Sequence, residues 1–271
     1  MAATSIAEAL RSAGIDPADA RVLLRAALQA SDAHLVAHPE QALTDIESGR
    51  YRAWLERRRA GEPVAYLTGE REFYSLAIKV TPAVLIPRPE TELLVEAALG
   101  WIPADAPVRV LDLATGSGCV AVAIARHRAR ARVAAADVSR DALAVARDNA
   151  LKHGVDVEFI ESDWFAAFSG RRFDLIVANP PYVAAGDPHL EQGDLRFEPR
   201  GALVAGAAGL DCIELIVEQA VHHLAAGGRL LFEHGYDQGP RSRALLAAAG
   251  YEDIVTRRDL AGSERVSGGR V

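Results

Sequence analysis

The sequence predicts an α/β fold with a helical domain ahead of it. From residue 108 onward, short apolar runs alternate with helical stretches, which is the order of a parallel sheet covered by helices on both faces. The first seventy residues show helical patterns only. A chain of 271 residues, half of them hydrophobic, is long enough for two cores. We therefore expect a helical domain over residues 1–70, a linker over 71–88 and an α/β domain over 89–271.

Helix-start signals recur in the predicted helical domain. Residues 5–8 and 44–47 both have the pattern of a capping box, in which a hydroxyl and a glutamate side chain each bind the other residue's backbone N–H. Asp16-Pro17 places a capping side chain directly before a proline that suits the first helical turn. Gly61-Glu62-Pro63 then ends the helix that begins near residue 44. These signals predict a small bundle of short helices.

The predicted linker has a different pattern. Between Glu72 and Pro87, apolar side chains nearly alternate with polar ones, and Thr81-Pro82 interrupts them. The pattern predicts a β-hairpin. A helical pattern then runs from Glu90 through Leu99 and opens the α/β domain.

Seven segments of the α/β domain have the composition of strands. Five are short apolar runs and two are β-like segments near the C-terminus: Val108–Leu113, Arg132–Asp137, Val157–Glu161, Phe173–Ala178, Arg229–Glu233, Tyr251–Thr256 and Glu264–Val271. They predict one mostly parallel, seven-stranded sheet. The stretch from Val183 to Gly209 is long, polar and interrupted by prolines, and it directly follows a strand. Because open sheets bind ligands at the carboxyl ends of their strands, it is a candidate substrate loop.

Composition and charge disfavour several classes of protein. No apolar stretch approaches membrane-spanning length and the N-terminus lacks a signal-peptide pattern, so we expect a cytoplasmic protein with no membrane partner. A net charge of −7 disfavours a protein that binds by neutralising phosphates, so no nucleic-acid partner is expected. Cys119 and Cys212 lie far apart in different patterns, and the histidines share no ligand spacing. We therefore expect reduced thiols and no metal.

A glycine-rich turn joins the first strand of the predicted sheet to a helix. In residues 110–118 the glycines let a ligand approach backbone that a Cβ would obstruct. The first N–H groups of the helix that starts at Cys119 can complement an anionic group. Gly116, Gly118 and Ala121 also satisfy the dinucleotide fingerprint. The turn alone therefore leaves nicotinamide dinucleotides and S-adenosylmethionine both open.

Two further residues are candidates for the same ligand. Asp137 ends the next strand, at the interval where an acidic side chain commonly accepts from both ribose hydroxyls, although it could also be a turn or capping residue of the following helix. After the third strand, Trp164 is the candidate for a wall against an adenine ring. The neighbouring Phe165 is explained equally well by core packing.

The most specific signal is the tetrapeptide Asn-Pro-Pro-Tyr at residues 179–182, which arises by chance with odds on the order of 10⁻³. It follows the fourth predicted strand. An amide nitrogen is a poor nucleophile, so a transferase must orient it with hydrogen-bond acceptors. The Asn179 side-chain oxygen and the Pro180 carbonyl can each accept one N–H of an –NH₂ group. Pro181 stiffens the turn, and Tyr182 offers a flat face to a planar group. This pattern favours methyl transfer from a sulfonium donor without a metal.

The same residues resemble the HemK/PrmC family of protein-(glutamine-N5) methyltransferases, and the resemblance covers nearly the whole chain. Besides the glycine-rich turn and the tetrapeptide, the segments that carry it are Gly61–Gly69, Arg71–Tyr74, Leu85–Glu92, Ser162–Phe165, Asp187–Leu190 and Arg196–Pro199. The chain departs from the family at Ala114, where the family usually has glycine. The backbone there must adopt a conformation that alanine tolerates.

The resemblance implies a Rossmann-like class I methyltransferase domain that uses S-adenosylmethionine and releases S-adenosylhomocysteine. It implies that the partner is a class I peptide chain release factor, methylated at the glutamine of its Gly-Gly-Gln motif and recognised by the helical domain. The cofactor contacts would be Ala114, Thr115, Gly116, Ser117, Gly118, Asp137, Trp164 and Asn179. The substrate glutamine would meet Asn179, Pro180, Pro181 and Tyr182, with Asn179, Pro180 and Tyr182 in catalytic roles.

Three other interpretations remain open from the residues alone. An adenine-N6 nucleic-acid methyltransferase would present a similar planar –NH₂ to the same turn, although the acidic charge disfavours it. A nicotinamide-dependent oxidoreductase fits the glycines but gives the tetrapeptide no role. A non-catalytic binding module would bind neither cofactor. Nothing in the sequence suggests an obligate oligomer, so a monomer is expected.

Overall fold

The computed structural model describes residues 4–271 as two compact units. The first unit contains the chain up to Glu70 together with His189–Phe197, and the second contains Arg71–Pro188 and Glu198–Val271. The chain therefore enters the first unit twice. The second passage falls inside the candidate substrate loop.

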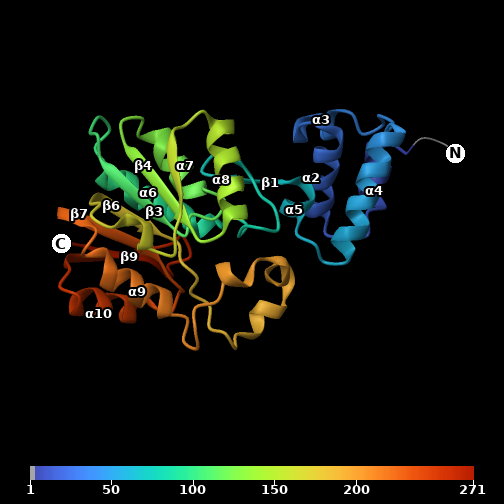
Figure 1. Cartoon of the computed structure of the whole chain (residues 1–271). Coiled ribbons are helices and arrows are strands. Elements are labelled where there is room, and N and C mark those ends of the chain that lie inside the picture. The colour runs from blue at the N-terminus through green and yellow to red at the C-terminus, as the bar shows by residue number, and fades with distance from the viewer. Residues whose placement is uncertain (1–3) are drawn as a thin grey trace. The chain divides into compact units, whose positions relative to one another are not determined.

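The first unit is helical, as Figure 1 shows in blue. Its helices are α1 (Ile6–Arg11), α2 (Pro17–Leu28), α3 (Asp32–Ala37), α4 (Asp45–Arg59) and α5 (Val64–Thr68). The capping box predicted at Thr44 is complete, because the hydroxyl accepts from Glu47 N–H and the Glu47 carboxylate accepts from Thr44 N–H. At Ser5 only the hydroxyl half is seen, accepting from Glu8 N–H. Buried side chains from these helices, among them Leu23, form a separate core.

The second passage through this unit forms two 3₁₀ helices, η3 (Pro188–Glu191) and η4 (Gly193–Phe197). Arg58 of α4 pairs with Asp194 at 3.0 Å and with Asp19 of α2 at 2.7 Å. Arg196 donates to the carbonyl of Ala60 at 3.1 Å. The segment is thus attached to the helical unit by charged side chains.

The predicted hairpin is present, but its turn lies earlier than the sequence pattern suggests. Strands β1 (Glu70–Phe73) and β2 (Leu76–Lys79) pair around Tyr74 and Ser75, whose φ angles are 50° and 61°. Two left-handed residues in succession form the tight turn that suits the twist of a hairpin. The interruption at Thr81-Pro82 therefore lies after the second strand. The backbone of Lys79 bonds twice to the Asn149 side chain, at 2.7 and 3.0 Å, so the hairpin is anchored to the second unit.

The second unit is built on one seven-stranded sheet, which confirms the predicted fold class. The strands are β3 (Arg109–Leu113), β4 (Arg132–Asp137), β5 (Val157–Glu161), β6 (Phe173–Ala178), β7 (Leu224–Glu233), β8 (Glu252–Arg258) and β9 (Glu264–Arg270). Their order is β5-β4-β3-β6-β7-β9-β8. The pairs from β5 to β7 are parallel, and β9 pairs antiparallel with both of its neighbours, β7 and β8. Strand β7 begins at Leu224, five residues before the predicted run, and its pairing with β6 contains an irregularity.

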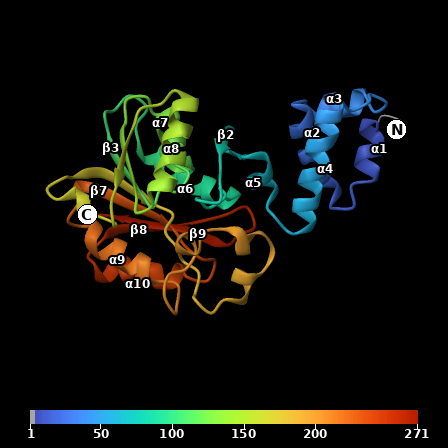
Figure 2. The same cartoon turned by 45° about the vertical axis from the view of Figure 1, so that its right-hand side comes forward.

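Helices cover the sheet on both faces, as Figures 1 and 2 show. One layer contains α6 (Glu92–Trp101), α7 (Cys119–His127) and α8 (Arg140–His153), and the other contains α9 (Asp211–Ala220) and α10 (Gly239–Ala248). Short 3₁₀ turns are η1 (Pro89–Thr91), η2 (Ala166–Phe168) and η5 (Arg200–Ala202). Because the chain leaves β3 toward β4 and returns at β6 to the other side, the strand order reverses between β3 and β6. Ligands of open sheets bind at such a reversal.

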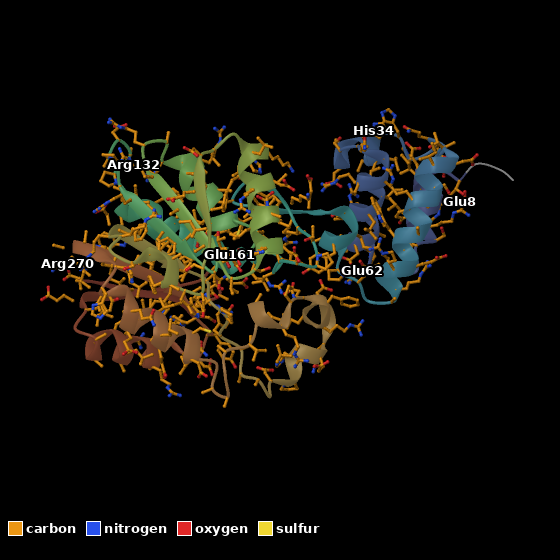
Figure 3. The ribbon with its side chains drawn as sticks, in the orientation of Figure 1. Glu8, His34, Glu62, Arg132, Glu161 and Arg270 are labelled. Carbon is orange, nitrogen blue, oxygen red and sulfur yellow. The ribbon has the colours of Figure 1, made fainter. Side chains whose placement is uncertain are left out.

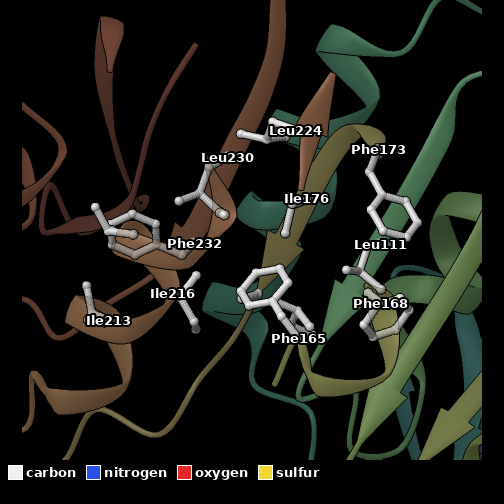
Figure 4. Close-up of a cluster of buried hydrophobic side chains, with 14 of the residues drawn as sticks. Leu111, Phe165, Phe168, Phe173, Ile176, Ile213, Ile216, Leu224, Leu230 and Phe232 are labelled. Carbon is white, nitrogen blue, oxygen red and sulfur yellow. The ribbon is translucent and has the colours of Figure 1, made fainter. Parts of the chain in front are cut away.

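A continuous apolar core supports this sheet. Figure 4 shows Leu111 and Ile176 of neighbouring strands with Ile216 of α9 and the rings of Phe168 and Phe232. All five are almost completely inaccessible to solvent. Burial of side chains this large contributes about 1.5–3 kcal/mol each, so the strands that carry the site are held rigidly.

Many charged side chains lie on the outside of the two units. Figure 3 labels Glu8 on the helical unit and Arg132 and Glu161 on the sheet unit, and all three are exposed. Within residues 4–271, no helix has both the length and the apolar character needed to cross a membrane.

Candidate functional site

The glycine-rich turn and the Asn-Pro-Pro-Tyr turn meet at the carboxyl edge of the sheet. Leu113 at the end of β3 pairs with Ala178 at the end of β6. The next residues along the two strands are Ala114 and Asn179. The two most specific sequence signals, some sixty residues apart in the chain, are therefore neighbours at the reversal of strand order.

A cavity of about 260 Å³ opens at this edge, within the second unit. Its lining includes most of the predicted cofactor residues: Ala114, Thr115, Gly116, Ser117, Asp137, Trp164 and Asn179. Pro181 also lines it. Gly118, Pro180 and Tyr182 lie next to lining residues but are not themselves part of the lining. Other walls come from residues 83–88 and from Pro199, Gly201 and Ala202 at the end of the candidate substrate loop.

The glycine-rich turn has three left-handed residues. The φ angles of Ala114, Gly116 and Gly118 are 55°, 55° and 77°. Ala114 thus adopts a conformation that costs a non-glycine residue about 1–2 kcal/mol. A Cβ on Gly118 would come within 2.9 Å of the Ala146 Cβ, so glycine there allows α7 to pack closely against α8. Gly118 is therefore required for the packing of the two helices, while Gly116 has no Cβ that would narrow the cavity.

A buried aspartate holds the turn. Asp112 Oδ2 accepts from the Thr115 hydroxyl at 2.6 Å and from the Ala121 N–H at 3.1 Å. Burial raises the pKa of Asp112 to about 7, against the lowering effect of these two hydrogen bonds. The carboxyl fixes the start of α7, whose first residue, Cys119, is buried with the pKa of its thiol raised to about 12 by desolvation. Cys119 is thus an uncharged structural thiol.

Asp137 ties the ends of two strands together. Its Oδ2 accepts from Gly116 N–H at 2.9 Å and its Oδ1 accepts from Ser139 N–H at 2.9 Å. Ser139, not Asp137, caps α8. Each carboxylate oxygen has a second lone pair, so these two bonds leave acceptor capacity toward the cavity that Asp137 lines. The residue can serve both as a turn residue and as an acceptor for ligand hydroxyls.

Trp164 and Phe165 occupy different environments. Trp164 is half-buried, lines the cavity and has a left-handed φ of 46°. Phe165 is buried in the core and stacks on His223 with ring centroids 4.7 Å apart. The Ser162 hydroxyl donates to the Trp164 carbonyl at 2.8 Å and supports the turn between them. Only Trp164 of this pair has a ring available to a ligand in the cavity.

Asn179 is held by a residue of the Leu85–Glu92 segment for which the sequence predicted no role. Its Nδ2 donates to the Thr91 hydroxyl at 3.0 Å. Thr91 ends η1 and is buried. Because Nδ2 is turned toward Thr91, the side-chain oxygen at the other end of the amide can face a ligand.

Tyr182 is anchored in the same region. Its hydroxyl donates to Glu233 Oε1 at 3.0 Å, and its carbonyl accepts from Gln238 Nε2 at 3.0 Å. Burial raises the pKa of the Tyr182 hydroxyl well above its usual range. Tyr182 is therefore a neutral donor whose polar end points to the end of β7 rather than to solvent.

Several residues of this site had no role predicted from the sequence, although Arg88, Thr91 and Glu198 lie in segments that carry the family resemblance. Thr91 stands at the start of a helix, and Glu233 stands at the end of a strand. Arg88, on the cavity wall, donates to Glu198 at 2.6 Å, and this carboxylate is buried. The only signal for Glu233 was a carboxylate at the end of an apolar strand, which usually means a buried, partnered group.

Among residues 4–271, no group of three or more histidine, cysteine or acidic side chains is arranged to hold a metal ion. His234 is one of the histidines without shared ligand spacing. It is buried and bonds to Ser267 at 2.9 Å, and desolvation lowers its pKa. It thus serves as a structural side chain of the sheet.

Comparison with known protein families gives two matches. The model described as the PrmC N-terminal domain matches residues 2–69, and the model described as the methyltransferase small domain matches residues 90–194. A release factor glutamine methyltransferase of Burkholderia pseudomallei is 52% identical over 272 residues, which cover 98% of this chain and 95% of the relative. One of Escherichia coli K12 is 46% identical over 253 residues, covering 93% and 91%.

Solved structures share the fold at lower identity. A methyltransferase from Pyrococcus furiosus is 17% identical, with a TM-score of 0.55, and the match covers 80% of this chain and 97% of that one. A 16S rRNA N2 G1207 methyltransferase of T. thermophilus, solved with AdoMet and guanosine, is 19% identical with a TM-score of 0.55, covering 74% and 49%. These likenesses concern the fold of the chain.

Proposed function

The chain belongs to the release factor glutamine methyltransferase family, and we propose that it methylates the side-chain amide nitrogen, N5, of the glutamine in the Gly-Gly-Gln motif of class I peptide chain release factors. The methyl donor is S-adenosylmethionine, which becomes S-adenosylhomocysteine. One observation supports the chemistry most directly: Asn179 lies beside the glycine-rich turn with its Nδ2 bound to Thr91. Within residues 4–271 its side-chain oxygen accepts no hydrogen bond, so it can accept from the amide that receives the methyl group.

The residues that line the cavity suit the binding of the methyl donor. Ala114–Ser117 offer backbone close to a ligand, and Asp137 retains acceptor capacity for two ribose hydroxyls. Trp164 supplies an aromatic face for adenine. The donor brings a methyl group already activated by its sulfonium, so the protein's task is to place the acceptor in line with it.

The acceptor end of the site orients a weak nucleophile. Asn179 Oδ1 and the Pro180 carbonyl would each accept one N–H of the glutamine –NH₂, which leaves the nitrogen facing the methyl group. Pro180 and Pro181 keep the turn stiff, and Tyr182 is fixed through Glu233. The two oxygens would stabilise the positive charge that the nitrogen acquires when it receives the methyl group. The nitrogen then loses one proton to solvent and the amide is neutral again.

The remaining features of the proposal concern the partner and the setting. We assign recognition of the release factor to the helical domain of residues 1–70 and to the 183–209 loop, which passes through both units. We propose that the enzyme acts as a monomer, without a metal and without a nucleic-acid partner. Its compartment is the cytoplasm, where translation terminates.

A labelled-methyl assay tests the proposed function. The full-length protein is incubated with labelled S-adenosylmethionine and a purified class I release factor, and with the same factor carrying Gln→Ala in its Gly-Gly-Gln motif. We expect label in the first factor and none in the second. Equal labelling of both would refute the assignment of the glutamine. Methylated adenine in parallel DNA and RNA samples would support the adenine-N6 alternative instead.

A further inference from the structure

Buried polar side chains lie between the Asn179 amide and the end of β7. Thr91 accepts from Asn179 Nδ2 at 3.0 Å. Glu233 accepts from the Tyr182 hydroxyl at 3.0 Å. The Thr91 hydroxyl also acts on this carboxyl and lowers its pKa. Thr91 and Glu233 are 2% and 1% exposed, so water does not compete for these groups.

The contact between Asn179 and Thr91 is not sufficient to fix the amide. An asparagine side chain has a donor end and an acceptor end, and a hydroxyl can meet either one. Asn179 could rotate its amide and still bond to Thr91. In the rotated form, Nδ2 would face the substrate –NH₂, and two donors would oppose each other.

Glu233 removes this ambiguity. An ionised carboxylate only accepts hydrogen bonds, so both neighbouring hydroxyls must donate to it. Tyr182 donates to Oε1, while Oε2 is buried and, among the described residues, has no partner in full hydrogen-bonding geometry. The Thr91 proton is the donor available to it. With its proton directed at Glu233, Thr91 has only lone pairs to offer Asn179, which must then present Nδ2.

We propose that Thr91 and Glu233 are positioning residues that hold the Asn179 amide with its oxygen toward the substrate. The ionised carboxylate of Glu233 draws the Thr91 proton, Thr91 accepts from Nδ2, and Oδ1 is left for the glutamine –NH₂. The inference rests on the proposed function, because that reaction needs an acceptor at this position.

The proposal makes turnover depend on the charge of Glu233. Burial raises the pKa of Glu233 to about 7, and the hydrogen bonds of Thr91 and Tyr182 oppose that rise. Among the described residues, the other charged or titratable groups that interact with Glu233 or Tyr182 are Arg265, Glu90, Arg88 and Cys119. Arg265 favours the ionised carboxyl and Glu90 disfavours it. Once protonated, Glu233 no longer requires the Thr91 proton, and the amide of Asn179 can rotate.

Nuclear magnetic resonance of the Asn179 side chain tests the orientation without any release factor. The ¹⁵N-labelled protein is saturated with S-adenosylhomocysteine, and the Asn179 amide signal is assigned by its loss in Asn179→Asp. We expect this signal to shift as the pH crosses about 7, the pKa of Glu233, and the shift to vanish in Thr91→Val. A signal that responds neither to pH nor to Thr91→Val would overturn the proposal.

Kinetics on the release factor supply the second arm. Thr91→Val should lower kcat by about 10²-fold, the effect of losing a preorganised hydrogen bond, with KM for S-adenosylmethionine unchanged. Thr91→Ser keeps the hydroxyl and should recover most of that rate. The wild-type kcat should fall as the pH drops below the pKa of Glu233.

Tyr251→Phe is the matched control, because it removes a buried hydroxyl that donates to the Val217 carbonyl in the core. Its kcat should equal that of the wild type. Equal losses in Thr91→Val and Thr91→Ser, or no loss in either, would contradict the positioning role. If the wild type itself leaves the release factor unlabelled, the proposed function fails, and the resonance measurement still decides the orientation.

Discussion

Asn179 carries a donor and an acceptor on one short side chain, so its rotation decides what the site can bind. The tetrapeptide pattern predicted the residue and the need for an acceptor oxygen. It could not predict the rotation, because Thr91 lies 88 residues away in sequence and has no pattern in common with it. The contact of Glu233 with Tyr182 could not be predicted either, because it forms only when β7 pairs with β6.

Replacing Asn179 by alanine removes the acceptor oxygen and leaves the substrate –NH₂ with one partner fewer. We expect kcat to fall by about 10²–10³, the magnitude known for a lost oriented hydrogen bond at a reacting group. Steady-state kinetics with a release factor measure the effect. A rate near that of the wild type would contradict the role assigned to this side chain.

Ala114 offers a second test at the scale of one residue. Its φ of 55° is unfavourable for a residue with a Cβ. Glycine relieves this cost but gains freedom in the unfolded chain, so Ala114→Gly should stabilise the protein by only about 0.5–1 kcal/mol. Ala114→Val should destabilise it, because a β-branched side chain tolerates this conformation least. Denaturant unfolding of both variants checks this, and a less stable Ala114→Gly protein would rule the explanation out.

Two buried carboxyls give the stability a definite dependence on pH. The pKa values of Asp112 and Glu233 are both raised to about 7 by burial. Groups with raised pKa values bind more protons in the folded state, so their contribution to stability is full at low pH and is lost as the pH rises through about 7. In Asp112→Asn this part of the decline should be smaller. The free energy of unfolding of the wild type and of Asp112→Asn is measured from the pH at which ordinary carboxyl groups titrate up to neutral pH. Parallel curves of this free energy against pH would contradict the prediction.

At the scale of elements, the sequence was most informative where a local pattern specifies local geometry. The strands of the sheet lie within a few residues of the predicted runs, and the capping box at Thr44 is complete. The position of the hairpin turn was harder to predict from the sequence. Tyr74 and Ser75 are unusual residues for two successive left-handed positions, so no Asn-Gly type signal marked the turn. Strand β7 begins earlier than its apolar run because residues 224–228 contain two alanines and two glycines.

The capping box of α4 should contribute measurably to the stability of the helical unit. Thr44→Ala removes the acceptor for Glu47 N–H and the partner of the Glu47 carboxylate. We expect a loss of about 1 kcal/mol in the free energy of unfolding of the helical unit. Ser48→Ala is the control within the same helix, because it also removes a hydroxyl but leaves the cap intact. Thermal melting of the two variants distinguishes them, and equal melting temperatures would show that the cap contributes nothing.

The chain divides into two units, and the sequence predicted this division only in part. The change from helical to alternating patterns near residue 70 is visible in the sequence. The assignment of His189–Phe197 to the helical unit is not, because it depends on Arg58 reaching Asp194, 136 residues further on. The loop after the Asn-Pro-Pro-Tyr turn is therefore attached to the helical unit in its middle, and its end returns to line the cavity. This continuity is why we assign both parts to recognition of the same partner.

A crystal structure with S-adenosylhomocysteine and a peptide containing Gly-Gly-Gln would examine the geometry on which the mechanism depends. We expect the glutamine nitrogen to donate to Asn179 Oδ1 and to the Pro180 carbonyl while it faces the sulfur, with Asn179 Nδ2 still bound to Thr91. A complex in which residues 179–182 point away from the sulfur, or in which Asn179 turns its nitrogen toward the glutamine, would contradict it.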